Sequence, residues 1–228
     1  LNGEFVIKEG VKEICANVFT KNTKITAVTI PSSVEKIGEA AFYNCSSLKT
    51  VTFVADSEGG ADKLTIGKNA FNQCSKIVGT ITFPARLTNI GNLAFNNVKS
   101  VSNFAFTGTK LEEIGEKAFQ NCDGLTEVVL PEGLKTLKAN AFAWCDALEK
   151  FHISSTVTEI GENQFANDDL LNELTVAASS KSFVVTDGIL YKTDANKNAI
   201  ELIICPVSNA GDAENKVVIP NTVVKVAD

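Results

Sequence analysis

The chain has 228 residues, 44% of them hydrophobic, and its 21 Lys and Arg against 27 Asp and Glu give a formal net charge of -6. Such a chain can fill a core, which excludes a disordered protein, and its length suits one or two domains. The acidic balance and the lack of a basic cluster argue against a nucleic-acid partner. No apolar run reaches about 18 residues, so no membrane-spanning helix is predicted.

A phenylalanine returns at near-constant spacing along most of the chain, with successive gaps of 23, 29, 24, 24, 23 and 23 residues. These phenylalanines are Phe19, Phe42, Phe71, Phe95, Phe119, Phe142 and Phe165. A period in this range is typical of a solenoid in which each repeat forms one small coil. The spacing therefore predicts about seven coils over residues 1–178.

One unit, "IPSSVEKIGEAAFYNCSSLKTVTF" at 30–53, shows what each part of a coil does. In its last six residues, side-chain alternation points Val51 inward and Thr50 and Thr52 outward, as expected for a strand. The "VEKI" segment adds a second short apolar rung, and Gly38 is expected to let the backbone turn. We expect "EAAFYNC" to form one helical or 3₁₀ turn that drives Phe42 into the core.

A single coil cannot bury its own apolar face, so stacking on neighbouring coils must close the core. The repeated strands then form one long parallel sheet along one face, with the helical or 3₁₀ turns on the other. The predicted fold class is this α/β solenoid.

Two segments interrupt the repeat. The acidic, Gly-rich "VADSEGGADK" at 54–63 accounts for the 29-residue gap and is predicted to be an exposed loop. Residues 179–206, which contain Asp187-Gly188 between apolar runs, are predicted to form a β-hairpin insertion. Residues 207–228 begin a further, incomplete repeat. That incomplete unit suggests either that the natural protein continues beyond this chain or that the end is a cap, and the start without Met suggests a mature or excised fragment.

Four cysteines, Cys45, Cys74, Cys122 and Cys145, each lie three residues after a repeat phenylalanine. They could form a metal or disulfide ladder, because neighbouring coils lie close enough to bridge. Val98 takes the same position in another repeat, which favours inward-facing core residues instead. Neither CxxC pairs nor His partners are present for zinc, and no cofactor or metal is expected.

Catalytic motifs are lacking as well: GxSxG, HExxH and GxxxxGK[ST] do not occur, so the chain is not predicted to be an enzyme. His152 is the only histidine, and we expect it to point outward from a strand. "DANKN" at 194–198 resembles the start of a calcium loop, but Ala199 and Cys205 stand where that loop needs Gly and Glu. A hairpin turn is the better interpretation.

The outward side chains of the main sheet are the predicted ligand-binding surface, since repeat proteins usually bind through such an extended face. The candidate residues are Thr50, Thr52, Thr80, Thr82, Asn103, Glu127, Lys150, His152 and Glu173. This face lacks the Trp, Tyr and Arg side chains common in tight interfaces, which favours weak or multivalent contact. Trp144 falls in a turn and could mark a surface spot elsewhere.

The unit at 30–53 resembles the leucine-rich repeats of the BspA-like, or Treponema pallidum, class, and "FVVTDGILY…LIICP…VVIP" is similar to an insertion found among them. The resemblance covers essentially the whole chain. It implies a secreted or surface-anchored bacterial protein, notably from relatives of Bacteroides, that serves adhesion or protein binding. It does not fix a ligand.

Three functions are therefore weighed. The first is an extracellular adhesion module that binds a host protein or glycan, including extracellular matrix. The second is a structural spacer within a larger surface protein. The third is a glycan hydrolase using Glu127 and Glu173, which two repeats would place about 9–10 Å apart, near the separation of an inverting pair.

Overall fold

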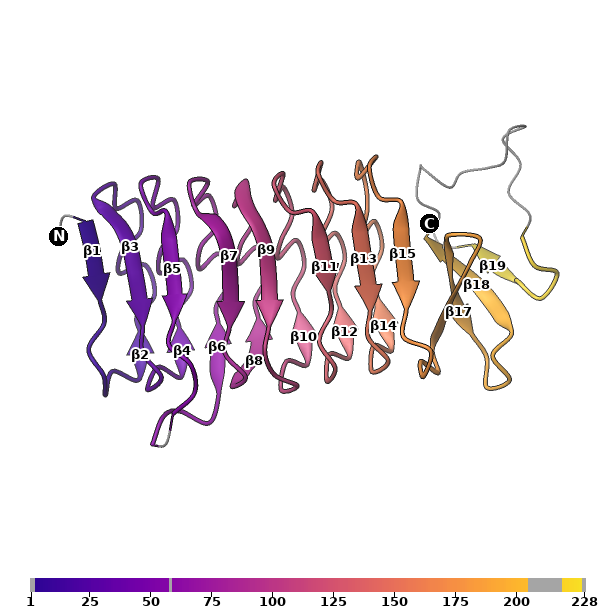
Figure 1. Cartoon of the computed structure of the whole chain (residues 1–228), viewed down its shortest axis with the longest axis horizontal. Helices are drawn as coiled ribbons and strands as arrows, with labels where there is room; N and C mark the ends of the chain where they lie inside the picture. Colours follow the sequence, from indigo (N-terminus) through magenta and orange to yellow (C-terminus); the bar gives the residue numbers. More distant parts are fainter. Residues whose placement is uncertain (1–2, 58, 205–218, 227–228) are drawn as a thin grey trace.

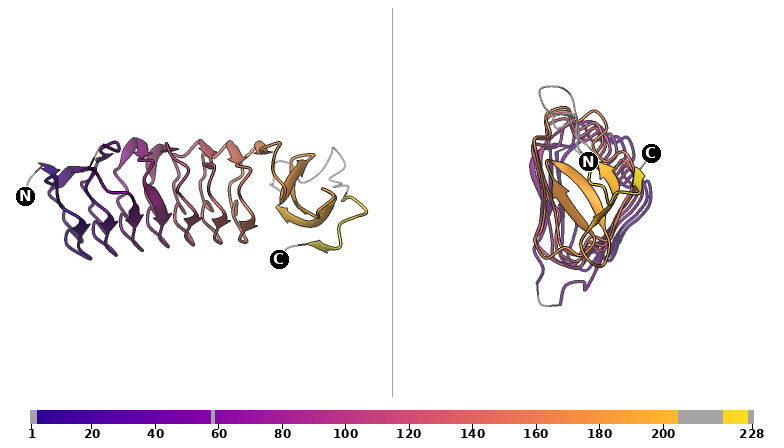
Figure 2. Two further views of the ribbon diagram at one scale, coloured as in Figure 1. Left: turned by 90° about the horizontal axis from the view of Figure 1, so that it is seen from below. Right: turned by 90° about the vertical axis from the view of Figure 1, so that its right-hand side faces the viewer.

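The computed structural model describes residues 3–57, 59–204 and 219–226. The coils stack side by side into an elongated solenoid, and a small separate sheet follows at the C-terminal end (Figure 1). Each coil crosses the molecule twice, once as a strand on the front face and once as a shorter strand on the back (Figure 2). The predicted repeat solenoid is therefore confirmed.

The front strands are parallel but form three sheets instead of one. Their orders are β1-β3-β5, β7-β9 and β11-β13-β15. The strands are β1 (Gly3–Val6), β3 (Ile25–Ile30), β5 (Thr50–Phe53), β7 (Val78–Phe83), β9 (Ser100–Phe106), β11 (Glu127–Val129), β13 (Lys150–Ile153) and β15 (Glu173–Val176). The prediction of one unbroken sheet on this face is wrong: the first break falls at the coil with the 54–63 insertion, and a groove separates β9 from β11.

The unbroken sheet lies on the back, where the sequence predicted only an apolar rung. Seven parallel strands pair in the order β14-β12-β10-β8-β6-β4-β2. They are β2 (Glu13–Ile14), β4 (Lys36–Ile37), β6 (Leu64–Ile66), β8 (Leu87–Ile90), β10 (Glu113–Ile114), β12 (Thr136–Leu137) and β14 (Glu159–Ile160). An Ile or Leu ends every one of these strands in matching register, so one aliphatic side chain per coil closes the core from this side.

The repeat phenylalanines form a stacked column through the core. Ring centroids of successive members from Phe19 to Phe142 lie 5.0–5.5 Å apart, with interplanar angles of 4–16°. From Phe42 to Phe142 these rings are fully buried. Phe165 leaves the column and instead meets Phe151 edge to face at 4.8 Å. Each such aromatic pair contributes about 0.5–1.5 kcal/mol beyond the burial of its surface.

The predicted helical turns are wrong: the described residues contain no helix, and thus none that could cross a membrane. Left-handed residues stand two before and two after each repeat phenylalanine, and a right-handed helix cannot pass through them. These residues are Asn17, Lys21, Ala40, Asn44, Asn69, Gln73, Leu93, Asn97, Lys117, Asn121, Asn140, Trp144, Asn163 and Asn167. Alternate N–H groups of each turn bond the next coil instead, as the Phe42 N–H does to the Ala70 carbonyl at 2.8 Å. The N–H groups between them close tight turns within the coil, as the Tyr43 N–H does to the Ala40 carbonyl at 3.1 Å.

The insertion at 54–63 leaves the solenoid between β5 and β6 (Figure 1) and is tied back by one buried arginine. Arg86 is 2% exposed, and its Nη1 donates to Asp56 Oδ1 at 2.7 Å and to the Val54 carbonyl at 3.2 Å. Its Nη2 donates to the Pro31 carbonyl at 3.1 Å. A buried guanidinium needs such partners, so it fixes where the insertion begins.

The C-terminal sheet has four strands in the order β16-β17-β18-β19. They are β16 (Phe183–Thr186), β17 (Ile189–Thr193), β18 (Ala199–Ile204) and β19 (Lys225–Val226). The first three pair antiparallel, and β19 pairs parallel to β18. Both turns fall where the sequence placed them, at Asp187-Gly188 and at 194–198, but the sheet is more than a single hairpin because β18 and β19 extend it. Cys205 and residues 206–218 lie outside the described part of the chain.

A glycine follows the back strand in most coils because the coils nearly touch there. A Cβ on Gly115 would lie 2.6 Å from the backbone of Gly91 and Asn92, and one on Gly67 would lie 2.8 Å from the Ile37 carbonyl oxygen. Gly38 is equally close to Cys15 and Ala16, so it is needed for close approach and not for the expected turn. Lys138 occupies the equivalent position in another coil. The hydrogen bond from its N–H to the Ile114 carbonyl is 3.0 Å long, whereas the one from the Gly115 N–H to the Ile90 carbonyl is 2.8 Å long.

Gly115→Ala is expected to lower the free energy of unfolding by about 1–3 kcal/mol, because two backbones must separate to admit the methyl group. Urea denaturation followed by circular dichroism measures the change. Lys138→Ala is the matched control at the same position of the next coil, where a Cβ is already accommodated, and should stay within about 0.5 kcal/mol. Equal stability of the two variants would show that close coil approach does not select glycine.

Candidate functional site

The outward side chains of the front strands form an accessible surface, called here the sheet face. Of the nine predicted residues, eight are exposed and His152 is half-buried. The nine are Thr50, Thr52, Thr80, Thr82, Asn103, Glu127, Lys150, His152 and Glu173. Strand register brings them into rows across neighbouring coils, but the two sheet breaks divide the rows into three groups.

The third group carries the charge. Register places Glu127, Lys150 and Glu173 side by side on β11, β13 and β15. The Lys150 Nζ lies 2.9 Å from Glu173 Oε2. This hydrogen bond to Glu173, with the attraction of that carboxylate, raises the pKa of Lys150. The row therefore holds one cation between two carboxylates at neutral pH.

A second row beside it is mixed in character. His152 Nδ1 lies 2.8 Å from Thr175 Oγ1. On the other side, Val129 of β11 is the cross-strand partner of His152 and is 52% exposed. Thr175 and Val129 were not among the predicted binding residues. The alternation of strand side chains was the signal that could have included them.

A groove on the sheet face joins the neutral and charged parts. It has a volume of about 300 Å³ and lies at the break between β9 and β11. Asn103 and Ala105 line one side, and Glu127 and Val129 line the other. The groove thus brings together two of the predicted residues, Asn103 and Glu127, from strands that do not pair. Thr50, Thr52, Thr80 and Thr82 lie on the front strands before it.

The arrangement does not resemble a glycosidase site. Glu127 and Glu173 are exposed, with Lys150 between them in register and paired to Glu173. A general acid needs burial or a like-charged neighbour to hold its proton, whereas a cation favours the ionised carboxylate. His152 bonds Thr175, and the nearby Cys145 thiol points into the core.

The cysteine column is structural, as the Val98 replacement indicated. Cys45, Cys74, Cys122 and Cys145 are fully buried. Each thiol donates to a phenylalanine carbonyl of the preceding coil, at distances of 3.0–3.5 Å. Burial raises the pKa of Cys145, so this thiol stays protonated and unreactive. The cysteines within the described residues are free, and no metal-binding group of three His, Cys, Asp or Glu occurs there.

Asp168 takes the cysteine position in the seventh coil and is an unusual buried acid. It is 2% exposed, and its Oδ1 accepts the Cys145 N–H at 2.7 Å. Its Oδ2 has no hydrogen-bond partner among the described residues. Burial, strengthened by Asp146 and Asp169, raises the pKa of Asp168 to about 8, although the Cys145 N–H opposes the shift. This carboxyl is therefore mostly protonated at neutral pH.

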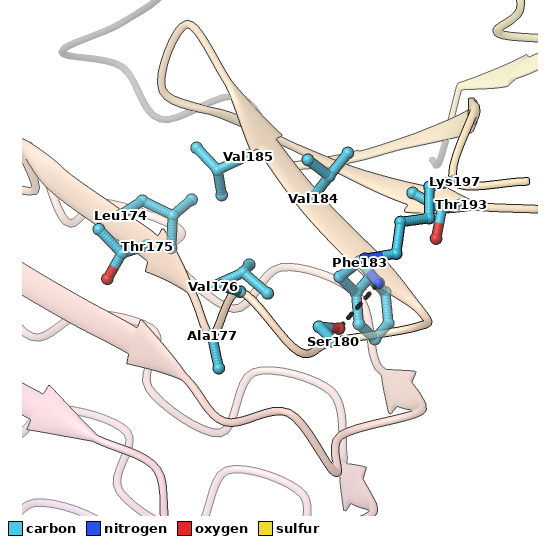
Figure 3. Close-up of a pocket in the computed structure, with 11 residues that line it drawn as sticks. Leu174, Thr175, Val176, Ala177, Ser180, Phe183, Val184, Val185, Thr193 and Lys197 are labelled. Atoms are coloured by element: carbon cyan, nitrogen blue, oxygen red, sulfur yellow. Dashed lines mark hydrogen bonds between the residues drawn. The ribbon is translucent and has the colours of Figure 1, made fainter.

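A second hollow lies between the last coil and the C-terminal sheet (Figure 3). Its volume is about 310 Å³, and its wall combines Leu174 and Val176 of β15 with Phe183 and Val185 of β16. The Phe183 N–H donates to Ser180 Oγ at 3.2 Å, which fixes the turn between these strands. The wall is mainly apolar and holds no pair of groups suited to catalysis.

The "DANKN" segment forms a turn whose aspartate is already occupied. Asp194 Oδ1 accepts the N–H groups of Asn196 and Asn198 at 2.8 and 2.9 Å, and Oδ2 accepts Asn198 Nδ2 at 3.0 Å. The Asn198 side chain and backbone lower the pKa of Asp194. These bonds agree with a turn, because the oxygens that a cation would need are engaged.

Comparison with known proteins assigns the repeats. A model of the BspA-type leucine-rich repeat region matches residues 3–59 and 61–172, in six copies. No curated protein sequence matches the chain.

Solved structures give the same result. A leucine-rich cell surface protein from Faecalibacterium prausnitzii is similar over 90% of this chain and 55% of its own, with 29% identity and a TM-score of 0.73. A leucine-rich repeat protein from Treponema pallidum matches 74% of this chain and 78% of its own, with 27% identity and a TM-score of 0.63. The pneumococcal vaccine antigen PcpA shares the fold, at 22% identity and a TM-score of 0.65. The chain spans about half the length of the first and the last of these.

Asp168→Asn is expected to stabilise the protein increasingly as pH rises. The folded state holds the proton of Asp168 up to about pH 8, whereas the unfolded carboxyl releases it near 3.8, so the stability that this proton gives is complete below about pH 4 and is lost through pH 8. Asn keeps an acceptor for the Cys145 N–H and cannot ionise. Urea denaturation from pH 4 to 9 measures the free energy of unfolding of variant and parent. The difference between them should widen by at most about 1.4 kcal/mol per pH unit and then level off.

The control for this prediction is Asp169→Asn, which makes the same substitution at an exposed neighbour. Its effect should be small and nearly independent of pH. A constant gap between Asp168→Asn and the parent across the range would contradict the raised pKa of Asp168.

Proposed function

Because the chain belongs to the BspA-type leucine-rich repeat family, we propose that it is a binding module of a bacterial surface protein, with the sheet face as its ligand-binding surface. The observation that carries the proposal is the groove between β9 and β11, where Asn103 and Glu127 meet beside the row of Lys150 and Glu173. In this recess of the sheet face, polar side chains from two neighbouring coils line one groove.

The chemistry of this surface suits a polar, uncharged or mixed-charge ligand. Glu127 and the paired Lys150 and Glu173 offer carboxylate acceptors and one ammonium donor, and Asn103 offers an amide. Val129 supplies an exposed apolar contact between them. A host protein surface or a glycan, including extracellular matrix, has matching groups.

Weak single contacts agree with this composition. The nine candidate side chains include no Trp, Tyr or Arg, the residues that supply most of the binding energy in tight interfaces. Affinity would then come from several modules acting together. The cell-surface description of the Faecalibacterium relative supports an extracellular location for this chain as well.

A structural spacer is the second candidate. Its support is the regular stack of coils (Figure 1), in which seven back strands pair from coil to coil along the solenoid. Such a rod holds another domain at a fixed distance without any ligand of its own.

A binding screen against extracellular-matrix proteins and glycans separates these two functions. We expect at least one ligand to bind, and binding to fall at least about tenfold when Glu127, Lys150, His152 and Glu173 are all changed to Ser, as for the loss of about 1.4 kcal/mol. Biolayer interferometry on the folded chain measures both.

The control changes Glu112, Glu113, Lys135 and Lys138 to Ser, which removes two ion pairs at the back sheet and leaves the sheet face intact. This variant should bind like the parent. Binding that survives in the first variant would move the site to another surface. A folded chain that binds nothing in the screen would make the spacer the better function.

A further inference from the structure

Trp144 lies in the turn between β12 and β13 and differs from every residue at the same position of the other coils. It is the only tryptophan of the sequence, its side chain is 47% exposed, and its backbone is left-handed with φ of 63°. The equivalent residues are Lys21, Asn44, Gln73, Asn97, Asn121 and Asn167. A large aromatic side chain therefore stands where the other coils use polar residues.

The left-handed backbone makes this choice unfavourable for folding. A bulky residue with positive φ is an outlier, whereas Asn adopts this conformation readily. About half of the indole stays exposed, and it stacks on no aromatic ring among the described residues. Strain retained at an exposed position points to a role at the surface.

The neighbours of Trp144 are amides and carboxylates. The Asn121 N–H donates to the Ala143 carbonyl at 3.1 Å, and the Trp144 N–H donates to the Ala166 carbonyl at 2.8 Å, so the turns of coils five to seven lie side by side. Asn121 and Asn167 therefore hold the equivalent positions in the coils on either side of Trp144. The row of Asp123, Asp146 and Asp169 runs along the same turns, two residues further on.

Two of these carboxylates are available to a ligand. Asp123 pairs with Lys99 at 3.0 Å, whereas Asp146 and Asp169 are exposed and make no ion pair with another described residue. A half-exposed indole on turns that also carry exposed carboxylates and amides suits a pyranose ring, which offers a C–H face to the indole and hydroxyl donors to the oxygens. The negative charge disfavours phosphorylated or sulfated ligands.

We propose that Trp144, with Asn121, Asn167, Asp146 and Asp169, forms a binding site for a neutral glycan on the turn side of coils five to seven. This site is separate from the sheet face, because the turns lie at the edge of each coil between its back and front strands. One exposed ring gives a platform for one sugar, so single-site affinity is low. A cage for a cationic group would need further aromatic side chains around the ligand, and the equivalent positions of the adjacent coils are Asn.

Because Trp144 is the only tryptophan of the sequence, its fluorescence reports directly on this site. The whole chain is titrated with maltotetraose, cellotetraose, mannotriose and triacetylchitotriose, and the intrinsic fluorescence is recorded. At least one of these sugars should shift the emission to shorter wavelength in a saturable way. Trp144→Asn should abolish binding of that sugar in isothermal titration calorimetry, while Trp144→Tyr keeps part of it. Asp146→Asn with Asp169→Asn should weaken binding several-fold.

Two controls keep the result specific. Trp144→Asn should keep or raise the melting temperature, because Asn suits the left-handed backbone; a lower melting temperature would assign the indole to packing and overturn the proposal. The sheet-face variant, with Glu127, Lys150, His152 and Glu173 changed to Ser, should bind the sugar as the parent does. This result distinguishes failure of the sheet-face function from failure of the Trp144 site. The proposal is also overturned if no sugar shifts the fluorescence, if Trp144→Asn still binds, or if only tetramethylammonium produces the shift.

Discussion

Close contact between neighbouring coils is the constraint on which the whole structure depends. One coil is a thin loop of backbone with an apolar interior, and only the coils before and after it exclude water from that interior. Backbone hydrogen bonds run between coils on the front strands, the back strands and the turns. Glycine after the back strand and the stacked phenylalanines both satisfy this contact, the first by allowing backbones to approach and the second by filling the space at the same interval.

The periodic part of the fold was predictable because one contact decides each repeated position. Buried Phe, the cysteine position and strand alternation followed directly from the spacing, and Cys45 and Cys145 are core residues as Val98 indicated. The turn was not predicted correctly. "EAAFYNC" suggests a helix when read alone, but alternate N–H groups of this segment bond the next coil and the others close local turns, which short-range sequence preferences do not reveal. Asn recurring two residues from each phenylalanine was the available signal.

Features that occur once were the hardest to predict. Arg86 and Asp56 are 30 residues apart, and nothing in the repeat pattern pairs them. The groove between β9 and β11 arises because these two strands do not pair. The sequence could therefore predict Asn103 and Glu127 as outward residues, but not that they line one groove. Asp168 was visible as a replacement for cysteine, yet its raised pKa depends on burial that only the structure shows.

The direction of the strands has a mechanical consequence. Front and back strands run across the long axis of the solenoid (Figure 1), so the hydrogen bonds between coils point along that axis. Tension applied between the two ends pulls these bonds apart one coil at a time instead of shearing many together. The solenoid should therefore lengthen by successive release of single coils at low force and re-form them when the load falls. Stretching of single molecules would record this as a series of small steps, whereas one large rupture would show that the coils fail together.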